Sequence, residues 1–128
     1  MAEFFHSVDK TRLVHYEGIF WNRKYDSITD MESRMYAKPA DIEEYLKSNP
    51  KKPFINCEYM HSMGNSLGGM SLYTDLEDKY EKYQGGFIWD YIDQAVYRIN
   101  EDGEKVLAYG GDFDDRATDY GFCTDGIV

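Results

Sequence analysis

The sequence has few cysteines and no long apolar run. Its 128 residues include only Cys57 and Cys123, which lie far apart and lack the close pairing of zinc ligands. Both lie among apolar residues, which favours buried free thiols over a disulfide and indicates a reducing cytoplasm. No apolar run approaches the roughly 18 residues that a membrane span needs. The N-terminal MAEFFHSVDK lacks the basic and then apolar pattern of a signal peptide.

Basic residues are scarce relative to acidic ones. The chain has 14 Lys and Arg against 24 Asp and Glu, which gives a formal net charge of −10. A surface this acidic repels phosphate groups. The composition therefore argues against nucleic acids and anionic membranes as partners.

Aromatic residues are abundant, with 12 Tyr, 7 Phe and 2 Trp making up 16% of the chain. Tyr and Trp combine a flat apolar face with a polar tip, and such side chains suit the alternating CH and OH faces of a sugar. An aromatic-rich core is the simpler explanation of composition alone. The sugar-binding interpretation therefore depends on more specific motifs.

Short apolar segments alternate with helical patterns along the chain. The residues favour strands at 11–16, 31–35, 54–57 and 85–89. They favour helices at 2–8, at 39–49, and from Asn65 or Ser66 to about Tyr83. Residues 19–30 are expected to form a loop, and a hairpin is expected around Asp102–Gly103. This alternation predicts parallel strands covered by helices, the α/β class.

Polar and aromatic side chains fall at the carboxyl ends of these strands. Glu58 directly follows the strand at 54–57, and Tyr36 follows the strand at 31–35. In a (β/α) barrel this face carries the active site, and a strand end is a rigid mount for a carboxylate. A single acidic residue after a strand is more often solvated or paired with a cation than catalytic. Only the surrounding motif can distinguish these roles for Glu58.

Several motifs at matching spacings resemble the β-galactosidases of glycoside hydrolase family 2. The resemblance is carried by the segments KPFINCEYMHSMGNSLGG, QGGFIWDYIDQ, YGGDF and FCTDG, and it extends upstream through TRLVHYEG and DMESRMYAKP. It therefore covers nearly the whole chain. The segment DMESRMYAKP is most similar to the corresponding segment in the large subunits of heterodimeric β-galactosidases from lactic acid bacteria.

The resemblance implies a partial TIM (β/α)8 barrel. Residues 1–128 are similar to the C-terminal half of the family's catalytic barrel, namely strands five to eight with a β-hairpin after the last strand. The segments that match these strands are TRLVHYEG, the residues before Tyr36, FINCEY and GGFIWDY. A complete barrel needs roughly 200 or more residues, so 128 residues would form a fragment.

A half-barrel would leave apolar groups and strand edges without cover. Unpaired edges expose backbone N–H and C=O groups to other chains. We therefore expect the fragment to self-associate. The lumen side chains expected to lose cover are Phe54, Ile55, Phe87 and Ile88.

The resemblance also implies roles for individual residues. Glu58 matches the family's nucleophile, and Tyr36 matches a tyrosine that lies beside it and helps to break down the glycosyl intermediate. His61 matches a histidine that contacts galactose hydroxyls, and Trp89 matches a tryptophan that forms the floor of the galactose pocket. Without the motif, each of these residues would more simply be read as structural.

The metal sites implied by the resemblance are incomplete in this chain. Phe122 matches a residue whose backbone carbonyl binds sodium near the galactose 6-hydroxyl. Asp125 falls where the best-known members have a sodium-binding Asn, so sodium use is an open question. The family's magnesium ligands and its acid/base glutamate, in a Gly-Asn-Glu motif, lie upstream of the matched region. The parent enzyme is expected to use magnesium and sodium.

The resulting hypothesis is a cytoplasmic fragment of a retaining β-galactosidase that hydrolyses terminal β-D-galactosides such as lactose. It would carry the nucleophile half of the site and need the missing N-terminal half of the barrel as its partner, so alone it is expected to be inactive. One alternative is a non-catalytic sugar-binding or structural remnant. Another is a different family 2 activity such as β-glucuronidase, against which CEYMHSMGNS and YGGDF argue.

Overall fold

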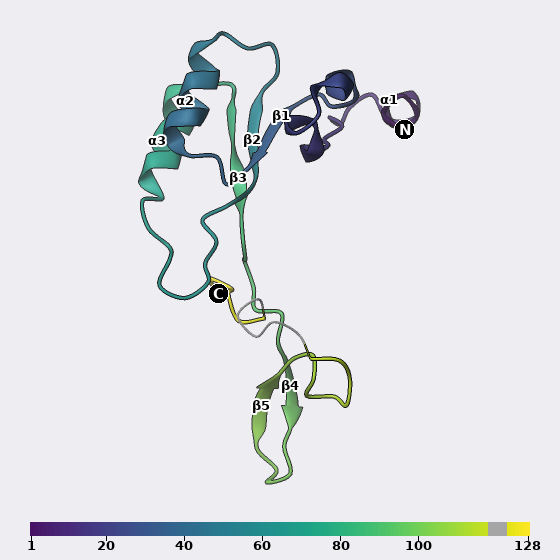
Figure 1. Ribbon diagram of the computed structural model, residues 1–128, viewed down its shortest axis with the longest axis vertical. Helices are drawn as coiled ribbons and strands as arrows, with labels where there is room; N and C mark the ends of the chain where they lie inside the picture. The colour runs from purple at the N-terminus through teal and green to yellow at the C-terminus, as the bar shows by residue number, and fades with distance from the viewer. Residues whose placement is uncertain (118–122) are drawn as a thin grey trace. The chain divides into compact units, whose positions relative to one another are not determined.

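A computed structural model describes residues 1–117 and 123–128 of the chain (Figure 1). The described residues divide into two compact units, which are treated separately here. Unit 1 comprises Met1–Tyr59 and Gly69–Phe87, and unit 2 comprises Met60–Gly68 and Ile88–Val128. No helix among the described residues combines the length and apolar character that a membrane span requires.

A three-stranded sheet with the order β1-β2-β3 forms the centre of unit 1. Its strands are β1 (Glu32–Met35), β2 (Phe54–Tyr59) and β3 (Tyr83–Ile88). Helix α2 (Pro39–Lys47) connects β1 to β2, and α3 (Ser71–Lys79) connects β2 to β3. Strands β1 and β2 are parallel, and the two helices lie side by side (Figure 1). This is the α/β arrangement that the sequence predicts.

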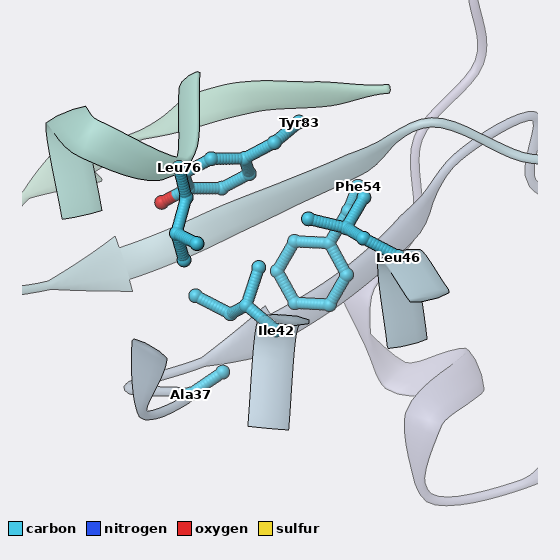
Figure 2. Packing of buried hydrophobic residues seen from close by; sticks show 6 residues of the cluster. All are labelled: Ala37, Ile42, Leu46, Phe54, Leu76 and Tyr83. Carbon is cyan, nitrogen blue, oxygen red and sulfur yellow. The ribbon is translucent and has the colours of Figure 1, made fainter. Parts of the chain in front are cut away.

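The core of unit 1 lies between the helices and the sheet, as Figure 2 shows. Pro39 occupies the first turn of α2, where its missing N–H costs nothing. Ile42 and Leu46 then fall on one face of the helix and pack against the fully buried ring of Phe54. The remaining members of the cluster are Ala37, Leu76 and Tyr83.

Phe54 was expected to face the barrel lumen, and this expectation is wrong. Its ring is 0% exposed and packs in the core beneath α2. Side chains alternate between the two faces of a strand, so Phe54 and Asn56 face the helices while Ile55 and Cys57 face the other way. Phe87, by contrast, is 64% exposed, as expected for a side chain that loses its cover.

A buried carboxylate ties the start of β1 to the segment before it. Glu32 is 4% exposed and accepts two hydrogen bonds of 2.6 Å from Arg23 and one of 3.1 Å from Arg34. Burial alone would raise the pKa of Glu32, but the hydrogen bonds from both guanidinium groups outweigh it and hold the pKa below its ordinary value. The Arg34 guanidinium also lies 5.0 Å from the ring centre of Phe20 and 5.5 Å from that of Phe54.

The strand expected at residues 11–16 does not form. Val14 instead bonds to Asp30, accepting from its backbone N–H at 2.8 Å and donating to its carboxylate at 2.7 Å. Tyr16 N–H donates to the Thr29 hydroxyl at 3.3 Å. One backbone bond and two bonds to side chains thus take the place of a strand ladder, and the segment stays outside the sheet.

Three further expectations concern helices. The N-terminal helix is confirmed as α1 (Ala2–Val8). The segment 19–30, expected to be a loop, is partly folded into short 3-10 helices: η1 (Glu17–Phe20) overlaps its start and η2 (Arg23–Ile28) lies within it. The helix expected from residue 65 or 66 begins only at Ser71, because Gly69 has a φ of +70°, which a helix cannot contain.

Unit 2 contains the predicted hairpin. Strands β4 (Val96–Ile99) and β5 (Lys105–Ala108) pair antiparallel, with Val96 opposite Ala108. Gly103 supplies the positive φ, +80°, that the turn requires. The hairpin around Asp102–Gly103 is therefore confirmed.

Candidate functional site

The side chains of Glu58 and Tyr36 meet at the ends of two neighbouring strands of unit 1. The Tyr36 hydroxyl donates a 3.0 Å hydrogen bond to Glu58 Oε2, and Tyr36 N–H donates to the Glu58 carbonyl at 2.8 Å. Because β1 and β2 are parallel and adjacent, their carboxyl ends lie at the same edge of the sheet. The structure thus brings together the two residues that the sequence predicts to be neighbours.

An irregularity in the pairing of β1 and β2 directly precedes Glu58. The pairing of β1 and β2 runs regularly to Arg34 opposite Asn56, and then Met35 faces Glu58. Cys57 is therefore skipped, which is the two-against-one count of a β-bulge. Bulges re-aim the side chains that follow them, and here that side chain is Glu58.

Strained backbone follows both strands. Tyr36, immediately after β1, has a φ of +53°, and Met60 and His61, immediately after β2, have φ values of +73° and +32°. Residues with a side chain rarely adopt this left-handed region, and such outliers concentrate at functional sites. This strain independently marks the two strand ends that the sequence motif selects.

Cys57, the residue before Glu58, is half-buried and makes no disulfide. Burial raises the pKa of the Cys57 thiol above its ordinary value. The thiolate is the nucleophilic form of cysteine, so at neutral pH this thiol stays protonated. It does not compete with the Glu58 carboxylate as a nucleophile.

In unit 2, Trp89 forms a hydrogen bond with a buried acid. Its indole Nε1–H donates to Asp125 Oδ2 at 2.9 Å. Asp125 is 1% exposed, whereas Trp89 is half-buried, so part of Trp89 remains accessible. The other oxygen, Asp125 Oδ1, has no hydrogen-bond partner among the described residues.

Ser62 connects three segments of unit 2. Its backbone N–H donates to the Trp89 carbonyl at 2.6 Å, and its hydroxyl donates to the Asp125 carbonyl. The same hydroxyl accepts a 3.0 Å hydrogen bond from Asp90 N–H. Ser62 directly follows His61, whose carbonyl accepts a hydrogen bond from Ser66. Sequence reasoning missed Ser62, since a serine in a Gly-rich loop carries no signal of its own.

The predicted site residues are therefore divided between the two units. Glu58 and Tyr36 belong to unit 1, and His61, Trp89 and Asp125 belong to unit 2. The predicted sodium ligand Phe122 lies outside the described residues. Within 1–117 and 123–128, no group of three or more His, Cys, Asp or Glu side chains could hold a metal ion.

The Glu58–Tyr36 pair has the chemistry of a supported nucleophile. A carboxylate oxygen of glutamate can act as a nucleophile, and the Tyr36 hydroxyl donates a hydrogen bond to one of the two oxygens of Glu58. The carboxylate lies at a strand end and is partly exposed, so a substrate carbon can reach it. The Glu58 carboxylate can therefore attack an electrophilic carbon and later act as a leaving group, while Tyr36 donates a hydrogen bond to it.

Comparison with known proteins adds independent information. A family model described as "Glycosyl hydrolases family 2, TIM barrel domain" matches residues 1–128. A β-galactosidase of Halalkalibacterium halodurans is 66% identical over 128 residues, which cover the whole chain and 13% of that protein. A β-galactosidase of Clostridium acetobutylicum is 63% identical, with 14% of its length covered. A β-galactosidase large subunit of Leuconostoc lactis is 57% identical over 130 residues, with 21% covered.

The chain matches only a small part of each relative. It spans between 13% and 21% of the length of these three curated proteins while being covered completely itself. The described strands and helices thus correspond to one segment of a much longer polypeptide.

Proposed function

The chain belongs to glycosyl hydrolase family 2, and from this premise we propose that it is the nucleophile-bearing fragment of a retaining β-galactosidase. The parent enzyme would hydrolyse terminal β-D-galactosides such as lactose. The observation that carries the proposal is the 3.0 Å hydrogen bond from Tyr36 to Glu58 at the ends of adjacent parallel strands. The β-galactosidase names of the relatives support the choice of sugar.

Glu58 acts as the nucleophile of a double displacement. One carboxylate oxygen forms a bond to the anomeric carbon while the bond from that carbon to the leaving oxygen breaks, and the leaving oxygen takes a proton from an acid. Water then attacks the same carbon, its proton goes to the base, and the Glu58 carboxylate leaves. Two inversions give net retention of configuration.

Tyr36 assists the second displacement. Its hydroxyl donates to Glu58 Oε2, which remains the acceptor when the other oxygen is bonded to the sugar. An ester oxygen is a poorer acceptor than a carboxylate oxygen. The hydrogen bond therefore strengthens as the carboxylate is released, and this favours breakdown of the intermediate.

The acid/base group lies in the rest of the parent enzyme. We assign β1, β2 and β3 to barrel strands six, seven and eight, and residues 11–16 to the position of strand five. Losing general acid help typically costs about 10²–10⁴ in rate. The missing N-terminal half of the barrel is thus the partner that this fragment needs for turnover.

His61 and Trp89 are proposed to bind the galactosyl group. Trp89 is half-buried, and the apolar face of its indole would contact the CH side of the sugar. The His61 ring would contact its hydroxyl groups. The strained φ of +32° at His61 supports a binding role, because such strain persists where the surroundings impose it.

Sodium and magnesium are proposed for the parent enzyme. Asp125 Oδ1, which is buried and has no partner among the described residues, fits a cation, and Phe122 would add its carbonyl. A sodium ion there would orient the 6-hydroxyl of galactose. The magnesium ligands are assigned to the part of the enzyme outside this chain.

A cytoplasmic location is proposed on the free thiols of Cys57 and Cys123. Self-association of the fragment is proposed on its exposed apolar side chains. Among those exposed are Trp21, Phe87 and Tyr97. In the parent enzyme, these surfaces would be covered by other parts of the polypeptide.

Trapping the covalent intermediate tests the proposal. The full-length enzyme would be treated with an activated 2-deoxy-2-fluoro-β-galactoside, digested and analysed by mass spectrometry. We expect the label on Glu58 in the wild-type enzyme and no label in Glu58→Gln. Glu77→Gln, on the exposed surface of α3, is the matched control and should label normally. A label on another carboxylate would overturn the assignment.

A further inference from the structure

We propose that Asp125 is a positioning residue that fixes the indole plane of Trp89 through the hydrogen bond from Nε1–H. The sugar-binding consequence of this inference rests on the proposed function. The bond measures 2.9 Å and joins the only donor of an indole to a carboxylate oxygen. Asp125 is 1% exposed, so the bond lies away from water on its acid side.

The carboxylate is itself held in place by the backbone around it. The Asp125 carbonyl accepts from the Ser62 hydroxyl and, at 3.3 Å, from Asp90 N–H. The next residue, Gly126, donates its N–H to Asp93 Oδ1 at 2.8 Å. Ile127 N–H then donates to the Asp90 carbonyl at 3.2 Å. The acid therefore projects from a segment whose position is fixed by successive hydrogen bonds.

Gly126 shows how closely this segment approaches its neighbour. A Cβ at Gly126 would overlap Asp93 N and would lie 2.6 Å from the Ile92 carbonyl carbon. Both contacts are to backbone atoms, which cannot move aside. Glycine at position 126 therefore permits the close backbone approach of the segment that carries Asp125.

A hydrogen bond at the tip of the indole removes its main freedom. A half-buried tryptophan rotates about two side-chain bonds, and Nε1 lies far from both of them. Anchoring Nε1 to a fixed oxygen therefore fixes the ring plane. A charged acceptor makes the bond stronger than a neutral one would. The Trp89 indole is thus held in one orientation toward a bound sugar.

The negative charge also acts on the ring electronically. The face of an aromatic ring carries the negative part of its quadrupole. A carboxylate that accepts from Nε1–H pushes electron density into the indole and makes this face more negative. The CH groups of a sugar carry small positive charges, so Asp125 strengthens as well as orients their contact with Trp89.

The indole N–H signals of the 15N-labelled chain test the positioning directly. The chain has two tryptophans, and Trp21 is 77% exposed, so its N–H should exchange rapidly with water. We expect the Trp89 N–H to exchange at least about tenfold more slowly. Asp125→Leu should remove this protection, and Asp125→Asn should keep part of it with a changed chemical shift. Trp21→Phe assigns the two signals.

Two results of this measurement would overturn the inference. One is a Trp89 exchange rate that Asp125→Leu leaves unchanged. If Asp125→Leu fails to fold, Asp125→Asn decides instead. An indole N–H chemical shift of Trp89 in Asp125→Asn identical to that of the wild type would show that Asp125 is not the hydrogen-bond acceptor. These readouts need no catalytic activity, so they decide the inference even if the proposed function fails.

A double-mutant cycle in the full-length enzyme tests the consequence for sugar binding. Asp125→Leu should raise the inhibition constant of galactose about tenfold, the loss expected for a hydrogen bond to a charged group. Asp125→Asn should restore most of it. In a Trp89→Phe background, which has no N–H, Asp125→Leu should cost clearly less than in the wild type, because only a contribution through the proposed sodium site remains. Additive effects, or rescue of Asp125→Leu by high sodium, would overturn action through the indole.

Discussion

Replacing Tyr36 by Phe in the full-length enzyme removes the hydroxyl that donates to Glu58 Oε2 at 3.0 Å. A hydrogen bond to a charged group contributes about 1.5–3 kcal/mol. Tyr36 is 38% exposed, which places it at the lower end of this range. A loss of about 1.5 kcal/mol slows a reaction step about tenfold.

The two chemical steps should respond differently. In the first step Glu58 starts as a carboxylate and becomes an ester, so losing a donor to the carboxylate does not hinder it. In the second step the carboxylate is regenerated, and the missing donor raises the barrier. Tyr36→Phe should therefore slow degalactosylation about tenfold and leave galactosylation nearly unchanged.

Rapid-quench kinetics with an activated aryl β-galactoside can separate the two steps. The variant should release a burst of one equivalent of phenol per site, followed by slow turnover. Methanol, a better nucleophile than water, should accelerate that slow phase. Tyr97→Phe is the matched control, because Tyr97 is 63% exposed on the β4–β5 hairpin. Equal slowing of both steps, or no slowing, would refute the reasoning.

The remaining predictions concern stability and assembly. Phe54→Ala should lower the free energy of unfolding, measured by urea titration, by about 3–5 kcal/mol. Phe87→Ala, at a 64% exposed site, should lower it far less. Equal losses of stability would contradict the core described here. The pKa of Glu32 is lowered from 4.5, so the stability that its ion pairs contribute is fully present above pH 4.5 and is lost as the pH falls through the lowered pKa. Glu32→Gln should therefore make the free energy of unfolding less dependent on pH in the acid range, as followed by circular dichroism. An acid unfolding curve identical to that of the wild type would contradict this. The isolated chain should show no hydrolysis of aryl galactosides and should sediment as more than a monomer, and a monodisperse monomer would disprove the second statement.

Much of unit 1 follows from local patterns in the sequence. Pro39 and the spacing of Ile42 and Leu46 define α2, and the apolar run from Phe54 defines β2. The turn signal Asp102–Gly103 likewise defines the hairpin of unit 2. In each case the local signal and the packing agree, which is why the pattern suffices.

The failures occur where long-range contacts override local preference. Residues 11–16 look like a strand, but the Thr29 and Asp30 side chains bond to their backbone in place of a neighbouring strand. The side of the sheet on which Phe54 lies depends on the packing of α2, which a strand pattern alone does not give. The bulge at Cys57 and the contacts of Ser62 also depend on partners distant in sequence.

The candidate site was predicted only through its motif. The pairing of Tyr36 with Glu58 agrees with the resemblance, since 22 residues separate the two in sequence and 3.0 Å separate them in space. The bond between Trp89 and Asp125 was not foreseen, because Asp125 was considered only as a metal ligand. A buried acid that accepts a hydrogen bond from an indole N–H 36 residues away produces no periodic pattern in a sequence.

The protonated thiol of Cys57 has a practical consequence for chemical labelling. Soft electrophiles such as iodoacetamides and maleimides react with thiolates, and burial suppresses the thiolate at this position. Epoxide- or aziridine-bearing sugar mimics, which are opened by carboxylates, would reach Glu58 without being diverted to the adjacent sulfur. An activity-based probe of this kind could therefore report on the carboxylate in a complex mixture while the cysteine beside it stays silent.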